Sequence, residues 1–347
     1  MKSPFRRDLR RRAAAAAIVA LLVTACASGG GAGGERGATP DPAVAHANQV
    51  AAGAERYVEG YFGDGDRRLH YVEAGGGDLV IFYHGFPSFW LSFFDQMEAL
   101  KGRYRVVAVD GLGAGLSAKP DSLDAYRIDK LAADIDALAR HFAGDQPFIL
   151  IGHDWGAALA FAFAQAYPER LAKVVGLSAP PYELFLEMLE ESAVQQRASG
   201  YMREITATTT EAVIADPPGQ RLFEIGYAGL VRSGALSHAE GELFRAALAP
   251  AAASNGGYNW YRANIPSSDE KATSMSWPAP GARIAVPALL VWGETDRTFD
   301  AAFIERLESR SDRLTIEVIS GVGHWTPIER PEAAAEAIRR FLESEAS

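Results

Sequence analysis

The stretch that decides the fold is "GHDWGA", residues 152–157. It follows the apolar run "FILI" and precedes the alanine-rich run "GAALAFAFA", so it joins a predicted buried strand to a predicted helix. Gly152 and Gly156 permit a sharp turn where a side chain would clash. The turn presents Asp154 at a helix N-terminus, which stabilises negative charge. The pattern predicts a nucleophilic carboxylate on a strand–turn–helix elbow; the alternative is an ordinary N-cap aspartate.

Short apolar runs recur on both sides of this turn. They are "RLHYVEAG", "DLVIFYHGFP" and "YRVVAVDGLGAG" before the turn, and "KVVGLSAP", "AVPALLVWGETD" and "LTIEVISGVGHW" after it. Helical patterns lie between them, such as "DKLAADIDALARHFAG", with apolar residues three and four apart. This alternation predicts the α/β fold class, with a mostly parallel central sheet flanked by helices.

The alternation stops for about a hundred residues near the middle of the chain. Residues 180–279 contain no buried-strand run and are rich in Ala, Glu and Gln. We therefore predict a helical cap over 180–279, inserted between two parts of one core, 55–179 and 280–347.

The N-terminus has the pattern of an export signal. "MKSPFRRDLRRR" is strongly basic, and the uncharged "AAAAAIVALLVTA" follows and ends at residue 25. "VTAC" before Cys26 is similar to the lipobox of bacterial lipoproteins, which implies lipidation of Cys26. We predict an export signal over 1–25, a glycine-rich flexible tether over 26–54, and a cell-envelope lipoprotein held to a membrane by its N-terminal lipid. An uncleaved anchor helix is the alternative.

Charge and cysteine content narrow the possible partners. The formal net charge of the chain is −10, and because the basic segment carries +5, the remainder carries −15. Such a surface repels nucleic acid. The chain has one cysteine, so lipidation of Cys26 leaves no thiol for a disulfide or a zinc site. We expect no metal and no organic cofactor. The sequence does not indicate whether the protein is a monomer or an oligomer.

A carboxylate nucleophile needs oxyanion donors, a base and an acid that orients the base. "HGFP", residues 84–87, ends an earlier apolar run, and there the amide of Phe86 can pair with that of Trp155 as an oxyanion hole. His324 in "GVGHWTP" follows the last predicted strand and is the expected base.

The acid comes from the preceding strand end. Asp296 in "VWGETD" is the expected partner of His324, and Glu294 in the same turn is the alternative. The order Asp154, Asp296, His324 is nucleophile, acid, base, as in the α/β-hydrolase triad.

The chain resembles α/β-hydrolases of the epoxide hydrolase and haloalkane dehalogenase branch. "HGFPSFW", "DGLGAGLSAKP", "GHDWGA", "WGETD" and "GHWTPIERPE" are similar to its motifs, in order. The resemblance implies that Asp154 attacks a saturated carbon and that His324 then activates water against the alkyl ester. Gly111 and Leu112 depart from the Leu-Arg of many relatives, which we interpret as a loop variation.

Epoxide opening needs acids in the cap, because the leaving oxygen becomes an alkoxide. "GYNWYRANIP" resembles the "NWYR" cap motif of epoxide hydrolases, which implies Tyr261 as one donor. Tyr201 resembles the second cap tyrosine, and Tyr182 is its rival. His84, Trp155 and Tyr182 are expected in the substrate pocket.

The resulting hypothesis is hydrolysis of a small apolar epoxide by water to a vicinal diol. One alternative is a haloalkane dehalogenase with the same nucleophile, although many of these have Asn where this chain has Phe86, and Phe cannot donate to a halide. A second is a non-catalytic lipoprotein that binds a ligand in the same pocket.

Overall fold

One eight-stranded sheet organises the protein in the computed structural model, which describes residues 40–266 and 271–344. The predicted export signal over 1–25 and Cys26 lie outside these residues. The sheet order is β1-β2-β4-β3-β5-β6-β7-β8, and all pairs from β4 to β8 are parallel. The strands are β1 Val58–Phe62, β2 Leu69–Ala74, β3 Asp78–Tyr83, β4 Tyr104–Val109, β5 Phe148–His153, β6 Leu171–Leu177, β7 Ala288–Gly293 and β8 Leu314–Ile319.

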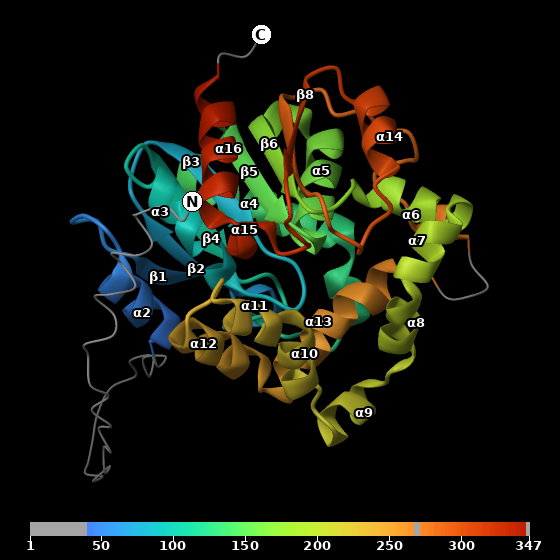
Figure 1. Ribbon diagram of the computed structural model, residues 1–347, viewed down its shortest axis with the longest axis horizontal. Coiled ribbons are helices and arrows are strands. Elements are labelled where there is room, and N and C mark those ends of the chain that lie inside the picture. The colour runs from blue at the N-terminus through green and yellow to red at the C-terminus, as the bar shows by residue number, and fades with distance from the viewer. Residues whose placement is uncertain (1–39, 267–270, 345–347) are drawn as a thin grey trace.

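The central strands are buried on both sides by two layers of helices. On one face α3 packs against α16, and on the other α4, α5, α6 and α14 form a row (Figure 1). The core helices are α3 Phe94–Leu100, α4 Ile128–Ala143, α5 Trp155–Ala166, α6 Tyr182–Glu191, α14 Phe303–Arg310, α15 Thr326–Glu329 and α16 Pro331–Glu343. Single 3-10 turns occur at Gly65–Arg67, Trp90–Phe93, Leu123–Tyr126, Pro168–Arg170 and Ala272–Met275. The predicted α/β-hydrolase architecture is confirmed.

The first edge of the sheet departs from the parallel pattern. β1 pairs antiparallel with β2, and β2 pairs antiparallel with β4. The alternating pattern predicts β2, but β1 is an edge strand with mostly half-buried residues and gives no apolar run. An edge strand can be stabilised by its neighbour's backbone hydrogen bonds, which sequence patterns do not record.

A helix lies where the sequence predicts the second part of a flexible tether. Helix α2, Pro42–Val50, begins at the N-cap Asp41, whose carboxylate accepts a hydrogen bond from the Ala43 amide. The second oxygen of Asp41 accepts from the Trp90 indole at 2.7 Å, and Ala47 is fully buried. The prediction of a tether over 26–54 is therefore wrong for this helix, because a capped and docked segment has lost its chain freedom.

Short helices follow β6 and form the predicted insertion. α6 packs against α5 and α14, so it extends the core layer although it lies within the range predicted for the cap. The helices that cover the carboxyl ends of the strands are α7 Ala193–Ala198, α8 Gly200–Ala207, α9 Thr210–Ala215, α10 Gly219–Gly226, α11 Ala228–Ser233, α12 His238–Leu248 and α13 Ala251–Asn264 (Figure 1). We call α7–α13 the cap.

Helix α13 joins the cap to the core. Its Trp260 indole donates to the Leu112 carbonyl at 2.7 Å, and a Cβ on Gly256 would lie 2.3 Å from the Gly113 carbonyl oxygen. A Cβ on Gly111 would lie 2.5 Å from the Trp260 ring. Gly111 and Gly113 therefore let α13 approach the loop after β4 closely, which gives the unusual Gly111 a packing role.

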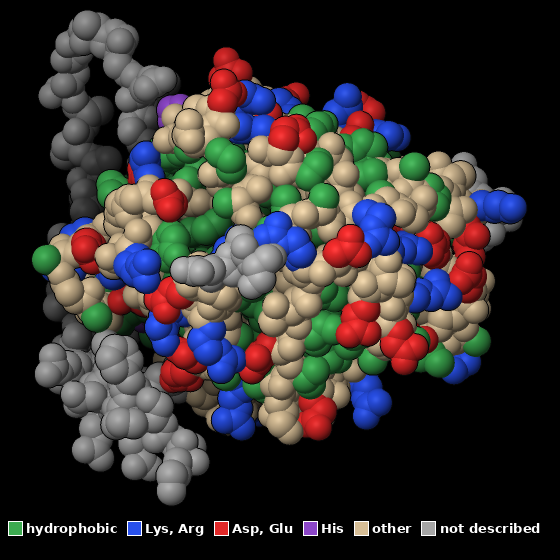
Figure 2. Space-filling model, turned by 90° about the horizontal axis from the view of Figure 1, so that it is seen from above, with side chains coloured by type: hydrophobic (Ala, Val, Ile, Leu, Met, Phe, Trp, Pro, Cys, Tyr) green, Lys and Arg blue, Asp and Glu red, His purple; other side chains and the backbone are tan. Residues whose placement is uncertain are grey.

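The surface opposite the cap carries both signs of charge. Lys and Arg side chains are interspersed there with Asp and Glu (Figure 2). Among the residues that the structure describes, no helix combines the length and the apolar character needed to cross a membrane.

Candidate active site

Asp154 occupies the sharp turn between β5 and α5. Its φ is +54°, a left-handed conformation that costs free energy for a residue with a side chain. A Cβ on Gly152 would lie 2.0 Å from the Gly156 carbonyl oxygen, and one on Gly156 would lie 1.9 Å from that of Tyr83. Both positions therefore require glycine, and the turn holds the buried Asp154 carboxylate at the end of the sheet.

Three side chains from separate strand ends meet at this turn. His324 Nε2 lies 3.3 Å from Asp154 Oδ2, and His324 Nδ1 lies 2.9 Å from Asp296 Oδ2. Asp296 is buried, and its other oxygen accepts from the Thr298 amide at 2.8 Å. Glu294 is exposed and accepts from Ser320 and Gly321, so it is not the partner of His324.

The two carboxylates favour the protonated form of the histidine between them. Burial alone would lower the pKa of His324, but the charges of Asp296 and Asp154, with hydrogen bonds to both, raise it to about 10. Burial alone would raise the pKa of Asp154, but the hydrogen bond and the charge of His324 hold it below its usual value. At neutral pH the site therefore holds an Asp154 carboxylate and a His324 imidazolium.

Two backbone amides point at the Asp154 carboxylate. The Phe86 N–H donates to Asp154 Oδ1 at 2.9 Å, and the Trp155 N–H also donates to this carboxylate. These are the two amides that the sequence predicts for an oxyanion hole.

A cavity of about 470 Å³ lies between Asp154 and the cap. Tyr201 on α8 and Tyr261 on α13 line it, and their hydroxyl groups share a hydrogen bond. The Trp155 indole also hydrogen-bonds Tyr261. Burial raises the pKa of both phenols, so they remain proton donors at neutral pH, although the outer part of Tyr201 is exposed. Donors of the cap thus face the carboxylate of the core.

Three residues expected in the pocket do not line this cavity. His84 Nδ1 lies 2.6 Å from the Gly85 carbonyl oxygen, and His84 Nε2 accepts from the Gly111 amide at 2.9 Å, so both nitrogens serve the loop. The Tyr182 hydroxyl donates to the Asn264 carbonyl at 2.7 Å, which excludes it as the second phenol. The Trp155 ring packs edge to face against the Tyr261 ring, with 5.2 Å between the ring centres.

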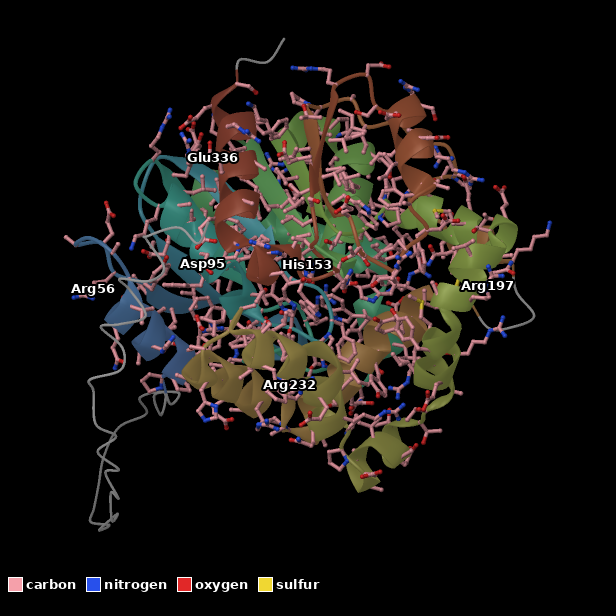
Figure 3. The ribbon with its side chains drawn as sticks, in the orientation of Figure 1. Arg56, Asp95, His153, Arg197, Arg232 and Glu336 are labelled. Carbon is pink, nitrogen blue, oxygen red and sulfur yellow. The ribbon has the colours of Figure 1, made fainter. Side chains whose placement is uncertain are left out.

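Sequence reasoning missed His153, the residue before Asp154. It lies near the centre of the molecule (Figure 3), fully buried, with Nε2 2.9 Å from the His324 carbonyl oxygen. Burial lowers its pKa to about 4, so the neutral ring must carry its proton on Nε2 to donate to that carbonyl. The position within "GHDWG" could have indicated a structural role, but not the contact partner.

The mouth of the cavity also escaped prediction. Glu204 on α8 and Arg221 on α10 both line the cavity and form an exposed ion pair at 3.1 Å. Ile225 on α10 lines the same opening and is 74% exposed. Exposed charges and single apolar residues are common on any surface, so no sequence signal distinguishes these three.

Within 40–266 and 271–344, no three His, Cys, Asp or Glu side chains gather closely enough to hold a metal ion. The elbow, the Asp–His–Asp arrangement and the covering helices define a hydrolase of the α/β class.

Comparisons agree with this class. Residues 78–331 match the alpha/beta hydrolase fold family. The chain belongs to this family, is a hydrolase, and is epoxide hydrolase-like within it. It is 32% identical to epoxide hydrolase 4 of Mus musculus over 89% of this chain and 85% of that protein. It is 30% identical to epoxide hydrolase 3 of the same organism, over 80% and 74% of the two chains.

A solved structure shares the fold. The Bacillus megaterium epoxide hydrolase in complex with an inhibitor superposes with a TM-score of 0.74. The match covers 82% of this chain and 100% of that one at 24% identity, so this comparison concerns the fold alone.

Proposed function

We propose that this protein hydrolyses an epoxide to a vicinal diol through a covalent ester on Asp154. One observation carries the proposal: a nucleophilic group and proton donors face each other across one cavity. The ionised Asp154 carboxylate of the core lies opposite two hydrogen-bonded phenols of the cap. The epoxide hydrolase names of the relatives support it.

Ring opening is the first step. An Asp154 oxygen bonds to one epoxide carbon, and the bond from that carbon to the ring oxygen breaks. The electron pair moves to the ring oxygen, which takes a proton from Tyr261 or Tyr201. Their raised pKa values keep both phenols protonated until an alkoxide, a stronger base, develops beside them.

Ester hydrolysis is the second step, and the first step prepares the base for it. Esterification removes the negative charge of Asp154, which is one of the causes of the raised His324 pKa. The pKa of His324 then falls, so it loses its proton to solvent, while the phenolate left by ring opening regains a proton from solvent. The neutral His324 ring can then accept a proton from water. That water attacks the ester carbonyl carbon, and the Phe86 and Trp155 amides stabilise the oxyanion. The oxyanion then collapses, and the bond from the carbonyl carbon to the alkyl oxygen breaks. The leaving oxygen takes the proton that His324 received from water, which releases the diol and restores the Asp154 carboxylate.

The residues that line the cavity favour a small, largely apolar epoxide as the substrate. Ile205, Leu222, Tyr258 and Pro87 are among the lining residues. Dehalogenation is less well supported, because a departing halide is best held by N–H donors. The Trp155 indole lies outside the cavity lining, and the Phe86 side chain has no donor.

A single-turnover incubation of His324→Gln protein with an epoxide tests the covalent scheme. We expect intact-mass spectrometry to show one alkyl adduct, mapped to Asp154 after digestion, because the variant can esterify but cannot activate water. His141→Gln, which changes an exposed histidine of α4, is the control and should turn over without an adduct. If His324→Gln protein forms no adduct while the control is active, the scheme is wrong.

We also propose, from the sequence alone, that the mature protein is exported and tethered to a membrane through a lipid on Cys26. Mass spectrometry of the N-terminal peptide from the membrane fraction tests this. A Cys26→Ser chain that keeps its membrane attachment would contradict the lipid tether.

A further inference from the structure

Tyr227 is a buried tyrosine at the junction of α10 and α11 that the proposed chemistry does not use. It is fully buried and is not one of the residues that line the cavity, although the preceding Gly226 is. Its ring stacks on that of Phe244 at 4.2 Å, which fixes it within the cap.

The Tyr227 hydroxyl reaches from the cap to the core loop that supplies an oxyanion donor. It donates to the Pro87 carbonyl and also hydrogen-bonds the Ser88 hydroxyl. Pro87 directly follows Phe86, whose amide points at Asp154. This hydroxyl therefore restrains the loop immediately beyond the Phe86 donor.

The Tyr227 ring touches the second loop that ester hydrolysis needs. It lies 4.8 Å from the ring of Trp325, the neighbour of His324 in sequence. The Trp325 ring in turn packs against His324 at 5.8 Å. One cap side chain thus contacts the oxyanion loop and the histidine loop together.

From these contacts we infer that Tyr227 is a positioning residue for ester hydrolysis, the second step of the reaction. From the cap it holds the Phe86 amide and the loop of His324 in fixed positions relative to each other. The inference rests on the proposed covalent function. Hydrolysis of the ester needs an amide aimed at the developing oxyanion and a histidine aimed at water, and it is sensitive to small displacements of either. Alkylation depends mainly on Asp154 and on the phenols across the cavity.

The test is Tyr227→Phe, which removes one hydroxyl and keeps the ring. Rapid-quench kinetics with an epoxide, followed by intact-mass detection, gives separate rate constants for formation and decay of the alkyl-enzyme. We expect decay to slow about tenfold, less than the ~10²–10³-fold loss on removal of an oxyanion donor, because the Phe86 amide is shifted and not removed. Formation should change less than about threefold, on the order of a small positioning effect. The alkylated fraction of the enzyme at steady state should therefore rise.

Tyr182→Phe is the matched control, because it also removes a buried phenolic hydrogen bond to a backbone carbonyl, away from the cavity. A purely structural loss would lower the active fraction of either variant and leave the ratio of the two rate constants unchanged. That result, or an equal slowing of both steps in Tyr227→Phe, would overturn the inference while leaving the covalent scheme intact. Turnover without any alkyl-enzyme would instead refute the scheme itself.

Discussion

The core and the cap contribute to one cavity by different structural means. The core supplies Asp154, Asp296 and His324 from loops at the ends of the parallel strands β5, β7 and β8, with contacts of 2.9 and 3.3 Å. The cap supplies Tyr201 and Tyr261 from two helices, α8 and α13, which are not directly connected to a strand of the sheet. Asp154 and Asp296 are buried and His324 is half-buried, whereas in the cap Tyr261 is buried and Tyr201 is 41% exposed.

This difference separates the chemistry into an obligatory part and an adjustable part. A sheet fixes its strand ends through many backbone hydrogen bonds, so Asp154 and His324, the proposed nucleophile and base, have one arrangement. The cap helices are short and are held mainly by packing, so they can vary in position and still present a donor. We therefore expect core substitutions to abolish turnover and cap substitutions to slow one step.

Removal of the nucleophile is the strongest test of the core. Asp154→Ala should lower kcat by about 10⁴-fold or more, because no second nucleophile faces the epoxide carbon. Steady-state diol formation measures the loss, with circular dichroism to show that the fold persists. Activity within tenfold of the parent would contradict the obligatory role.

The acid of the triad gives the next largest effect. Asp296→Ala should slow decay of the alkyl-enzyme by at least about 100-fold, since His324 loses its orienting partner. Glu294→Ala, in the same turn but exposed, should change that rate by less than about twofold. Equal effects of the two substitutions would mean that the described geometry does not operate in catalysis.

Substitutions of the cap phenols should act on ring opening and less strongly. Tyr261→Phe should slow formation of the alkyl-enzyme at least about tenfold, and Tyr201→Phe should do so to a smaller extent. Because the two hydroxyls share a hydrogen bond, each can partly replace the other, so the double variant should lose more than the product of the single losses. Strictly multiplicative effects, measured by rapid quench, would show that the phenols act independently.

The pH dependence should show the smallest effect. Because the pKa of Asp154 is lowered, this carboxylate is fully ionised at every pH above the ordinary aspartate pKa. The pKa of His324 is raised to about 10, so its ring stays protonated in the free enzyme below that pH. We therefore expect kcat/KM to vary by less than about twofold between about pH 5 and about pH 9, where both groups keep their charge. A midpoint near the ordinary histidine pKa would show that the ion pair is absent in solution.

Much of the core could be predicted because its motifs encode local geometry. Gly-x-Asp-x-Gly between an apolar run and a helix specifies an elbow, and the ends of parallel strands must meet at one edge of the sheet. The antiparallel strand β1 and the docked helix α2 were missed, since both depend on partners that are distant in the chain, such as Trp90 for Asp41.

The cap could be predicted only as a helical insertion. Tyr182 and Tyr261 are both buried aromatic residues in helical sequence, yet one donates to a backbone carbonyl and the other faces the cavity. His84 belongs to a recognisable motif, but its two nitrogens serve loop contacts. Side-chain direction in such cases follows from packing between helices, which sequence spacing does not determine.

By itself the sequence determined the strand–turn–helix elbow, the order in which Asp154, Asp296 and His324 follow the strands, and the presence of a helical insertion, because glycine spacing and apolar periodicity act locally. Only the tertiary structure decided that Asp296 rather than Glu294 reaches His324, that Tyr201 rather than Tyr182 joins Tyr261, and that Tyr227 bridges two loops of the site. The physical reason is that each of these choices depends on which segment lies opposite in space, and burial and hydrogen bonding across that gap select one candidate.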